Sequence, residues 1–270
     1  MAEGNSEVDV LLSELRDQYG YDLSEYSRPS LERRIARVMT FDSLGSIEAL
    51  RDKLKNKDYV NYFIEEVTVN VTEMFRDVAF FKTIRETILP RLATYPYIRI
   101  WHAGCSTGEE IYSMAILLEE AGLMERTLLY ATDINESVLE KARNAKYHIK
   151  NIEASKRNYQ KAGGTEDFNK YFKIEGKHAY FTKYLGEKVV YAMHNLVTDK
   201  SFNEFNLIVC HNVLIYFNKN LQNKVIGLFY DSLAMFGYLS LSINGTLTFS
   251  PHKTFFRKIN NECGLWQKTN

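Results

Sequence analysis

Residues 103–110 (AGCSTGEE) combine small residues with two acidic ones in a pattern that could hold a ligand. Gly104 and Gly108 would let the backbone approach that ligand closely, and the segment opens a predicted helix at 108–122 whose first turn offers unpaired N–H groups. The preceding residues 98–103 (IRIWHA) indicate a buried strand. Open α/β sheets bind nucleotide-like ligands at such a strand-to-helix connection. A plain turn is the alternative explanation of the two glycines.

An acidic residue, Asp133, follows a second predicted strand at 128–132 (LLYAT). Its position, about two dozen residues past the glycines, suits a carboxylate that accepts hydrogen bonds from ribose hydroxyls. The alternative is that Asp133 caps the helix that follows. The glycine spacing fits neither a dinucleotide motif nor a phosphate-binding loop. S-adenosylmethionine, which has a ribose and a charged sulfonium but no phosphate, therefore fits better than NAD or ATP.

A polar segment at 67–77 (VTVNVTEMFRD) mixes β-branched residues with hydrogen-bonding ones, which is unusual for a plain helix. Asn70, Thr72 and Arg76 supply hydrogen-bond donors and one fixed charge. Arg76 suits a carboxylate on the cofactor or on the substrate. A capped domain junction with a structural arginine is the alternative.

Residues 210–217 (CHNVLIYF) end a third predicted strand at 206–210. Residues at the carboxyl ends of parallel strands line the ligand crevice, so Asn212 and Tyr216 are candidates to contact cofactor and substrate. Cys210 fits a small buried residue better than a nucleophile. His211 has no partner that the sequence identifies, so a general-base role for it lacks support.

The elements that would position these residues fall into two parts. Residues 1–90 carry apolar residues at helical spacing, with Gly20 as a predicted helix end and Ser46 as a predicted N-cap. Residues 91–270 alternate short apolar strands with helices, which predicts an α/β fold with a parallel sheet covered on both faces. The predicted strands lie at 98–103, 128–132, 206–210 and 238–243, and the predicted helices at 108–122, 135–145 and 219–236.

The alternation lapses between residues 147 and 195. Residues 178–182 and 188–193 have the pattern of two paired short strands, so we expect an inserted antiparallel β-subdomain at about 165–193. A plain crossover with a long connection is the alternative.

Composition excludes several classes of protein. The chain has 270 residues, 45% of them hydrophobic and 25% charged, which excludes wholesale disorder. Its 34 basic and 34 acidic residues balance, so the chain has no net charge that would attract it to nucleic acid or to a membrane surface. Three widely spaced cysteines form neither a disulfide framework nor a zinc site, so we expect no metal and a reducing compartment. With no signal peptide and no long apolar run, we expect a cytoplasmic protein that inserts into no membrane.

Charge is uneven along the chain. Residues 1–90 carry 12 basic and 17 acidic side chains, yet Arg33, Arg34 and Arg37 cluster on one predicted helix there. Arg33 and Arg37 share a face of that helix. A docking surface and an ordinary solvated face are both compatible with the pattern.

Taken in order, these motifs resemble those of the chemotaxis receptor methyltransferases, the CheR family. The resemblance runs from about Leu11 to Trp266 and depends on five segments: VTVNVTEMFRD, RIWHAGCSTGEEIYS, ATDIN, the pair Asn195-Leu196, and CHNVLIYF. It implies a Rossmann-like class I S-adenosylmethionine-dependent methyltransferase domain, a small helical N-terminal domain and an inserted antiparallel β-subdomain.

The resemblance also implies an activity and a set of roles. Family members transfer methyl from S-adenosylmethionine to glutamate side chains of chemoreceptors, giving γ-glutamyl methyl esters and leaving S-adenosylhomocysteine. Arg76 and Tyr216 would lie nearest the acceptor glutamate, and Arg33, Arg34 and Arg37 would face the cytoplasmic region of a receptor. We expect the protein to act as a monomer. The residues implied to surround the cofactor are Asn70, Thr72, Arg76, Glu110, Asp133, Asn195, Leu196, His211 and Asn212.

Three positions depart from the family pattern. Ile111 replaces a proline, His211 replaces an arginine, and Gly245 stands where the family has an acidic residue. The last departure keeps a second hypothesis open, that of a non-catalytic signalling module that binds S-adenosylmethionine or S-adenosylhomocysteine and docks on a receptor or partner. A methyltransferase for nucleic acid or a small molecule is a third, disfavoured by the neutral charge and the lack of an Asn/Asp-Pro-Pro-aromatic motif.

Overall fold

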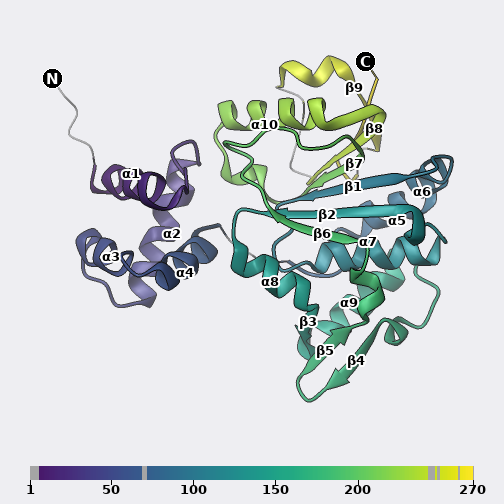
Figure 1. The fold of residues 1–270 in the computed structure, drawn as a ribbon, viewed down its shortest axis with the longest axis horizontal. Coiled ribbons are helices and arrows are strands. Elements are labelled where there is room, and N and C mark those ends of the chain that lie inside the picture. The colour runs from purple at the N-terminus through teal and green to yellow at the C-terminus, as the bar shows by residue number, and fades with distance from the viewer. Residues whose placement is uncertain (1–5, 69–71, 243–246, 248–249, 261, 270) are drawn as a thin grey trace.

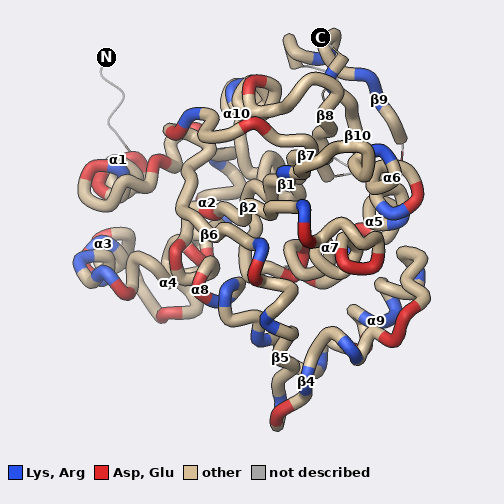
Figure 2. Tube along the Cα trace, turned by 45° about the vertical axis from the view of Figure 1, so that its right-hand side comes forward, with Lys and Arg blue, Asp and Glu red and all other residues tan. Residues whose placement is uncertain are grey.

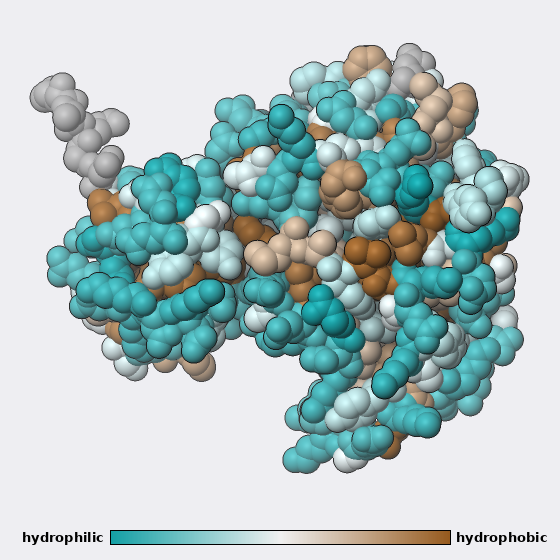
Figure 3. Space-filling model, viewed as in Figure 1, coloured by the Kyte–Doolittle hydropathy of each residue, from teal (hydrophilic) through white to brown (hydrophobic). Residues whose placement is uncertain are grey.

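A computed structural model describes residues 6–68, 72–242, 247, 250–260 and 262–269 of the chain. A helical domain at the N-terminus lies beside a larger domain built on a seven-stranded sheet (Figure 1). Both are largely hydrophilic on the face that Figure 3 shows. None of the described helices has the length and the apolar character needed to cross a membrane.

The helical domain buries one apolar stripe from each of its helices in a common core. The sequence signals act as predicted: Gly20 ends the first helix in a left-handed conformation with φ +79°, and the side chain of Ser46 caps the third. Acidic residues predominate on α1, whereas α3 carries both signs (Figure 2). The helices are α1 (Glu7–Tyr19), α2 (Arg28–Phe41), α3 (Ile47–Lys53) and α4 (Lys57–Thr68).

The sheet domain is a mixed sheet with the strand order β6-β2-β1-β7-β8-β10-β9. The first five strands in that order are parallel, and β10 runs antiparallel to both of its neighbours. The predicted strands at 98–103, 128–132 and 206–210 are confirmed within one residue at each end. The strands are β1 (Ile98–Ala103), β2 (Thr127–Asp133), β6 (Val189–Met193), β7 (Phe205–Cys210), β8 (Leu233–Leu241), β9 (Phe256–Asn260) and β10 (Leu265–Lys268).

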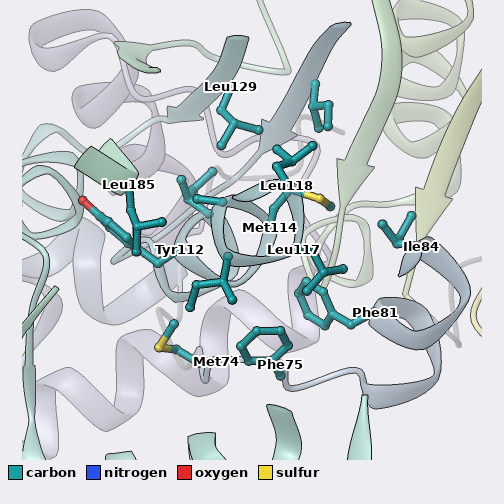
Figure 4. Close-up of a cluster of buried hydrophobic side chains, with 14 of the residues drawn as sticks. Met74, Phe75, Phe81, Ile84, Tyr112, Met114, Leu117, Leu118, Leu129 and Leu185 are labelled. Carbon is teal, nitrogen blue, oxygen red and sulfur yellow. The ribbon is translucent and has the colours of Figure 1, made fainter. Parts of the chain in front are cut away.

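Helices cover both faces of the sheet, as the apolar strands require. One core cluster joins α7 to Leu129 (Figure 4) and to Ile100. A second cluster joins α10 to residues such as Trp101 and Ile208 on the other face. The helices of this domain are α5 (Val78–Thr83), a π-helical turn (Ile84–Ile88), α6 (Leu89–Leu92), α7 (Glu109–Glu120), α8 (Glu136–Asn144), α9 (Ile152–Lys161) and α10 (Lys219–Ser232).

Two details of the predicted elements are wrong. The helix expected at 219–236 ends at Ser232, because its last four residues begin the long strand β8. The strand at 178–182 does not pair with the one at 188–193: β5 (His178–Phe181) pairs antiparallel with β3 (Lys146–His148) and β4 (Phe172–Glu175), whereas β6 joins the main sheet parallel to β2. The turn at Gly176, with φ +60°, lets β4 fold back on β5.

The apolar residues of α5, the π-helical turn and α6 belong to the core of the sheet domain, packed with Ile98 and Ile100 of β1. They were expected in a helical domain of residues 1–90. We therefore propose a domain boundary closer to the end of α4 at Thr68 than to residue 90.

A substitution at Gly108 tests the packing of the start of α7 against α8. The φ of Gly108 is +91°, and a Cβ there would lie 2.8 Å from the Cβ of Ala142 on α8. Gly108→Ala should therefore lower the free energy of unfolding by about 1–3 kcal/mol, through backbone strain and overpacking. Urea denaturation would measure the loss. Gly45→Ala is the matched control, because a Cβ at Gly45 meets nothing within 4 Å; equal stability of the two variants would contradict the packing role of Gly108.

Candidate cofactor and active site

A cavity of about 440 Å³ lies at the carboxyl ends of β1, β2, β6 and β7. Tyr26 and Thr68 of the helical domain form part of its wall. This edge of a parallel sheet is where α/β proteins bind their ligands. The cavity brings together ten of the residues predicted from the sequence: Thr72, Arg76, Gly104, Glu110, Asp133, Asn195, Leu196, His211, Asn212 and Tyr216.

The remaining predicted residues lie elsewhere. Gly108 is not among the described residues that line the cavity. It packs against Ala142, so the lack of a side chain at Gly108 lets α7 and α8 approach each other. Arg33 and Arg37 are exposed on α2. Asn70, like the departure at Gly245, lies outside the residues that the structure describes.

The turn after β1 is drawn close to the end of β2. The backbone N–H groups of Gly104 and Cys105 both donate to the carbonyl of Thr132, over 2.8 and 2.9 Å. Gly104 has φ +78°, and a Cβ there would lie 2.4 Å from Cγ2 of Val213. Only glycine therefore lets this turn and the loop after β7 approach each other at the cavity.

Asp133 is fixed by the same turn. Its Oδ2 accepts a hydrogen bond of 2.9 Å from the N–H of Ser106, and its Oδ1 accepts one of 3.1 Å from the N–H of Asn135. Burial raises the pKa of Asp133, and these backbone hydrogen bonds oppose the rise. The N-cap of α8 is Asn135, whose side chain accepts from Ser137. Asp133 therefore is not the side-chain cap of α8, and its carboxylate keeps acceptor positions for a ligand.

Glu110, in the first turn of α7, lies between two histidines at the floor of the cavity. Its Oε1 is 2.8 Å from Nδ1 of His102 on β1, and its Oε2 is 2.7 Å from Nδ1 of His211 after β7. Burial alone would raise the pKa of Glu110, but the two histidines outweigh it and hold that pKa well below its usual range. Among the described residues, no group of three or more ligating side chains could hold a metal ion.

Asn195 and Leu196 follow β6 and close the cavity on a further side. The side chain of Asn195 accepts from the N–H of Val197 over 2.9 Å, and its backbone N–H donates to Asp199 over 2.8 Å. These bonds make a fixed turn that presents the buried side chain of Leu196 to the cavity.

Arg76 and Tyr216 reach the cavity from opposite parts of the chain. Arg76 precedes α5, in a segment tied to α7 by a hydrogen bond of 3.0 Å from the N–H of Phe75 to Oγ of Ser113. Tyr216 lies in the loop after β7, and its carbonyl accepts a hydrogen bond of 2.7 Å from the N–H of Ser27 in the helical domain. Two residues expected to act on one substrate therefore line one cavity.

Arg34 differs from the two arginines with which it was grouped. Its guanidinium lies 4.4 Å from the centre of the Tyr216 ring, and it donates over 3.2 Å to the carbonyl of Val67 at the end of α4. Its Nε is buried. Arg34 therefore joins α2 to the Tyr216 loop, whereas Arg33 and Arg37 face outward.

Sequence reasoning missed several residues of the cavity wall and floor. Asp77 lines the cavity beside Arg76, and burial raises the pKa of its carboxyl. Tyr26 gave no local signal, because its place depends on a bridge to Phe217 far along the chain. His102 does not line the cavity but contacts Glu110, which does. It lies inside a predicted strand, where its inward direction could have been inferred from alternation but its partner could not.

Comparison with known proteins now decides the family. Residues 6–68 match the family model described as the CheR methyltransferase all-alpha domain, and residues 70–264 match its SAM binding domain. The chain belongs to the CheR methyltransferase family. It is accordingly an S-adenosylmethionine-dependent methyltransferase of class I fold, with a helical N-terminal domain and a small antiparallel sheet.

Several curated proteins resemble this CheR family member along most of its length. It is 39% identical over 272 residues to Cher3 of Pseudomonas putida, which is named as a methyltransferase. This match covers 99% of each chain. The protein is 30% identical to the chemotaxis protein methyltransferase of Salmonella typhimurium, covering 82% of this chain and 76% of the relative. Chemotaxis protein methyltransferase 1 of Vibrio cholerae is also 30% identical, with 87% and 86% covered.

The cavity fits the cofactor of this family. Oγ of Ser106 is buried at the cavity and has no hydrogen-bond partner among the described residues. The carboxylates of Asp133 and Glu110 have acceptor positions left, and the close approach at Gly104 excludes any side chain from the turn. Polar groups without partners in a cavity of this kind need a polar ligand.

Asp133 provides a direct test of the ligand's place. Asp133→Ala should weaken binding of S-adenosylhomocysteine by about 1–3 kcal/mol, or roughly 5- to 150-fold, because ribose hydroxyls lose their acceptor. Titration calorimetry would measure the change, with thermal unfolding as a check that the turn at Ser106 survives. Asp167→Ala, a cap remote from the cavity, should bind normally. Undiminished affinity in Asp133→Ala would contradict this placement.

Proposed function

We propose that this protein transfers methyl from S-adenosylmethionine to glutamate carboxylates in the cytoplasmic region of a chemoreceptor, acting as a cytoplasmic monomer. The products would be γ-glutamyl methyl esters and S-adenosylhomocysteine. The names of the relatives from Salmonella typhimurium and Vibrio cholerae support a role in chemotaxis. The observation that carries the proposal is the presence of Arg76 and Tyr216 on the cavity that also holds Asp133 and Glu110.

The residues of the cavity suit a reaction that needs no strong base. Bound S-adenosylmethionine supplies an electrophilic methyl group, and a glutamate acceptor is already ionised at neutral pH. Arg76 would hold that carboxylate, and the hydroxyl of Tyr216 would align it. Burial raises the pKa of Cys105 and of Cys210, so neither thiol is available as a competing nucleophile.

The helical domain would contribute to the alignment of the acceptor. The N–H of Ser27 holds the carbonyl of Tyr216, and the N–H of Asn218 donates over 3.0 Å to the carbonyl of Glu25. Arg34 covers the Tyr216 ring at the same place. These contacts restrict the orientation of Tyr216, which is what positioning a nucleophile requires.

Methyl transfer can be tested on the identity of the product. The protein is incubated with radiolabelled S-adenosylmethionine and a cognate receptor's cytoplasmic fragment, and the label is then followed through mild base. Carboxyl methyl esters are hydrolysed and release the label, whereas N-methyl groups keep it. Cofactor binding without any transfer would favour the alternative of a non-catalytic binding module, and base-stable label would indicate another acceptor.

The two proposed acceptor-site residues give the sharpest kinetic test. Arg76→Ala should raise the activation free energy of methyl transfer by about 2–4 kcal/mol, because the carboxylate loses its fixed cation. Single-turnover transfer should therefore be roughly 30- to 1,000-fold slower. Tyr216→Phe should lower turnover more than cofactor affinity, since the ring contacts remain. Arg99→Ala and Tyr97→Phe, both exposed and remote from the cavity, are matched controls. Wild-type rates in both active-site variants would contradict the proposal.

The arginines of α2 should separate into two classes. Reversing Arg33 and Arg37 to Glu should raise KM for the receptor and weaken its salt dependence, because family substrates are glutamate-rich. Arg34→Ala should instead lower kcat by roughly 2- to 30-fold, the loss expected for a cation–π contact of about 0.5–2 kcal/mol. The control is the charge reversal of Lys55 and Lys57 to Glu, in the same domain. Identical kinetic effects in both classes would show that Arg34 has no separate role.

A further inference from the structure

The cluster of His102, Glu110 and His211 has a property that cofactor binding alone does not require. All three side chains are largely buried: the exposed fractions are 0%, 19% and 6%. Glu110 accepts at each oxygen from a different histidine, so Nδ1 of each histidine must carry a proton. What differs between the two histidines is the surroundings of Nε2.

His102 is suited to the neutral state. Its Nε2 is buried and has no hydrogen-bond partner among the described residues. An imidazolium would place a charged N–H donor there without an acceptor, which is costly. The bare lone pair of the neutral Nδ1–H tautomer costs less.

His211 can exist in either state without losing a hydrogen bond. Its Nε2 lies 2.8 Å from Oγ of Ser240 on β8, and a hydroxyl can accept from an imidazolium or donate to a neutral ring. His211 is therefore the member of the cluster that can gain or lose a proton.

The groups around His211 come from several elements. Glu110 of α7 contacts it directly, Asp77 and Arg76 act on it from the segment before α5, and the ring of Phe80 on α5 packs 4.6 Å from its own. Burial alone would lower the pKa of His211, but the charge and the hydrogen bond of Glu110 outweigh it and raise that pKa above its usual range. The proton is thus held below that raised pKa and lost above it, at a pH higher than about 6.5.

We propose that this cluster distinguishes the charged cofactor from its uncharged product, with His211 as the residue that sets the preference. With His211 protonated, the cluster carries no net charge; with His211 neutral, it carries one negative charge. S-adenosylmethionine has a sulfonium, and S-adenosylhomocysteine has a neutral thioether in its place. The neutral state of His211 therefore favours the cofactor over the product, and the protonated state removes that preference.

The size of the effect follows from the cavity. A cavity of about 440 Å³, lined by Glu110 and His211, has a mean width of roughly 8 Å, and we take this width as the separation between a cationic ligand centre and the cluster. Two unit charges at such a distance, in a medium of effective dielectric constant about 20, change a binding ratio by roughly 30-fold. Residual water reduces this, and we expect a change of about tenfold.

Calorimetric titration of both ligands between pH 6 and pH 8.5 tests the proposal. In the wild type, the affinity for S-adenosylmethionine divided by that for S-adenosylhomocysteine should rise about tenfold as His211 loses its proton. The amino groups of the ligands also titrate, so the decisive comparison is between variants. His211→Gln should remove the His211 contribution, and His211→Arg should keep the ratio near its low-pH value. His178→Gln, on the remote β5 strand, should behave as the wild type does.

A second measurement does not depend on the variants folding. In the wild type, NMR titration of the His211 imidazole should show a pKa that falls when S-adenosylmethionine binds and changes much less with S-adenosylhomocysteine. Equal changes with both ligands, or wild-type pH dependence in His211→Gln, would overturn the proposal, as would failure of the wild type to bind either ligand. No receptor is used, so the result is independent of whether glutamate is the methyl acceptor.

Discussion

A largely buried carboxylate at the start of α7 is the constraint on which the site depends. The side chain of Glu110 cannot stay ionised there without partners, and it obtains them from β1 through His102 and from the end of β7 through His211. The N-terminal end of α7 favours the same negative charge. Three elements are thereby fixed to one another, and together they form the floor of the cavity.

The walls of the cavity depend on a second set of contacts, those between the two domains. Ser27 and Asn218 pair the backbone of the helical domain with the loop that carries Tyr216, and Tyr26 packs against Phe217 at 5.0 Å between ring centres. On the other side of the cavity, Asn135 and Ser137 at the start of α8 contact α4. The helical domain is therefore part of the wall of the site, as well as the surface for which docking is proposed.

The fold, and ten of the residues that line the cavity, could be predicted from the sequence because their signals are local. Apolar runs and helical periodicity located β1, β2, β7, α7 and α8, and glycine and acidic residues at the ends of strands indicated the cavity. The pairing of β6 was missed because a parallel partner lies far along the chain, and antiparallel neighbours are the local expectation. Arg34 was grouped with Arg33 and Arg37 because sequence spacing does not show that one turn of α2 faces Tyr216. The roles of Gly108 and His102 likewise depend on Ala142 and Glu110, which tertiary packing alone brings close.

A crystal structure of the complex with S-adenosylhomocysteine tests the placement of the site most directly. We expect the ligand in the cavity between the two domains, with its ribose hydroxyls within hydrogen-bonding distance of the Asp133 carboxylate and its sulfur open toward Arg76 and Tyr216. A ligand bound outside this cavity, or one whose ribose makes no contact with Asp133, would contradict the assignment of cofactor and acceptor residues.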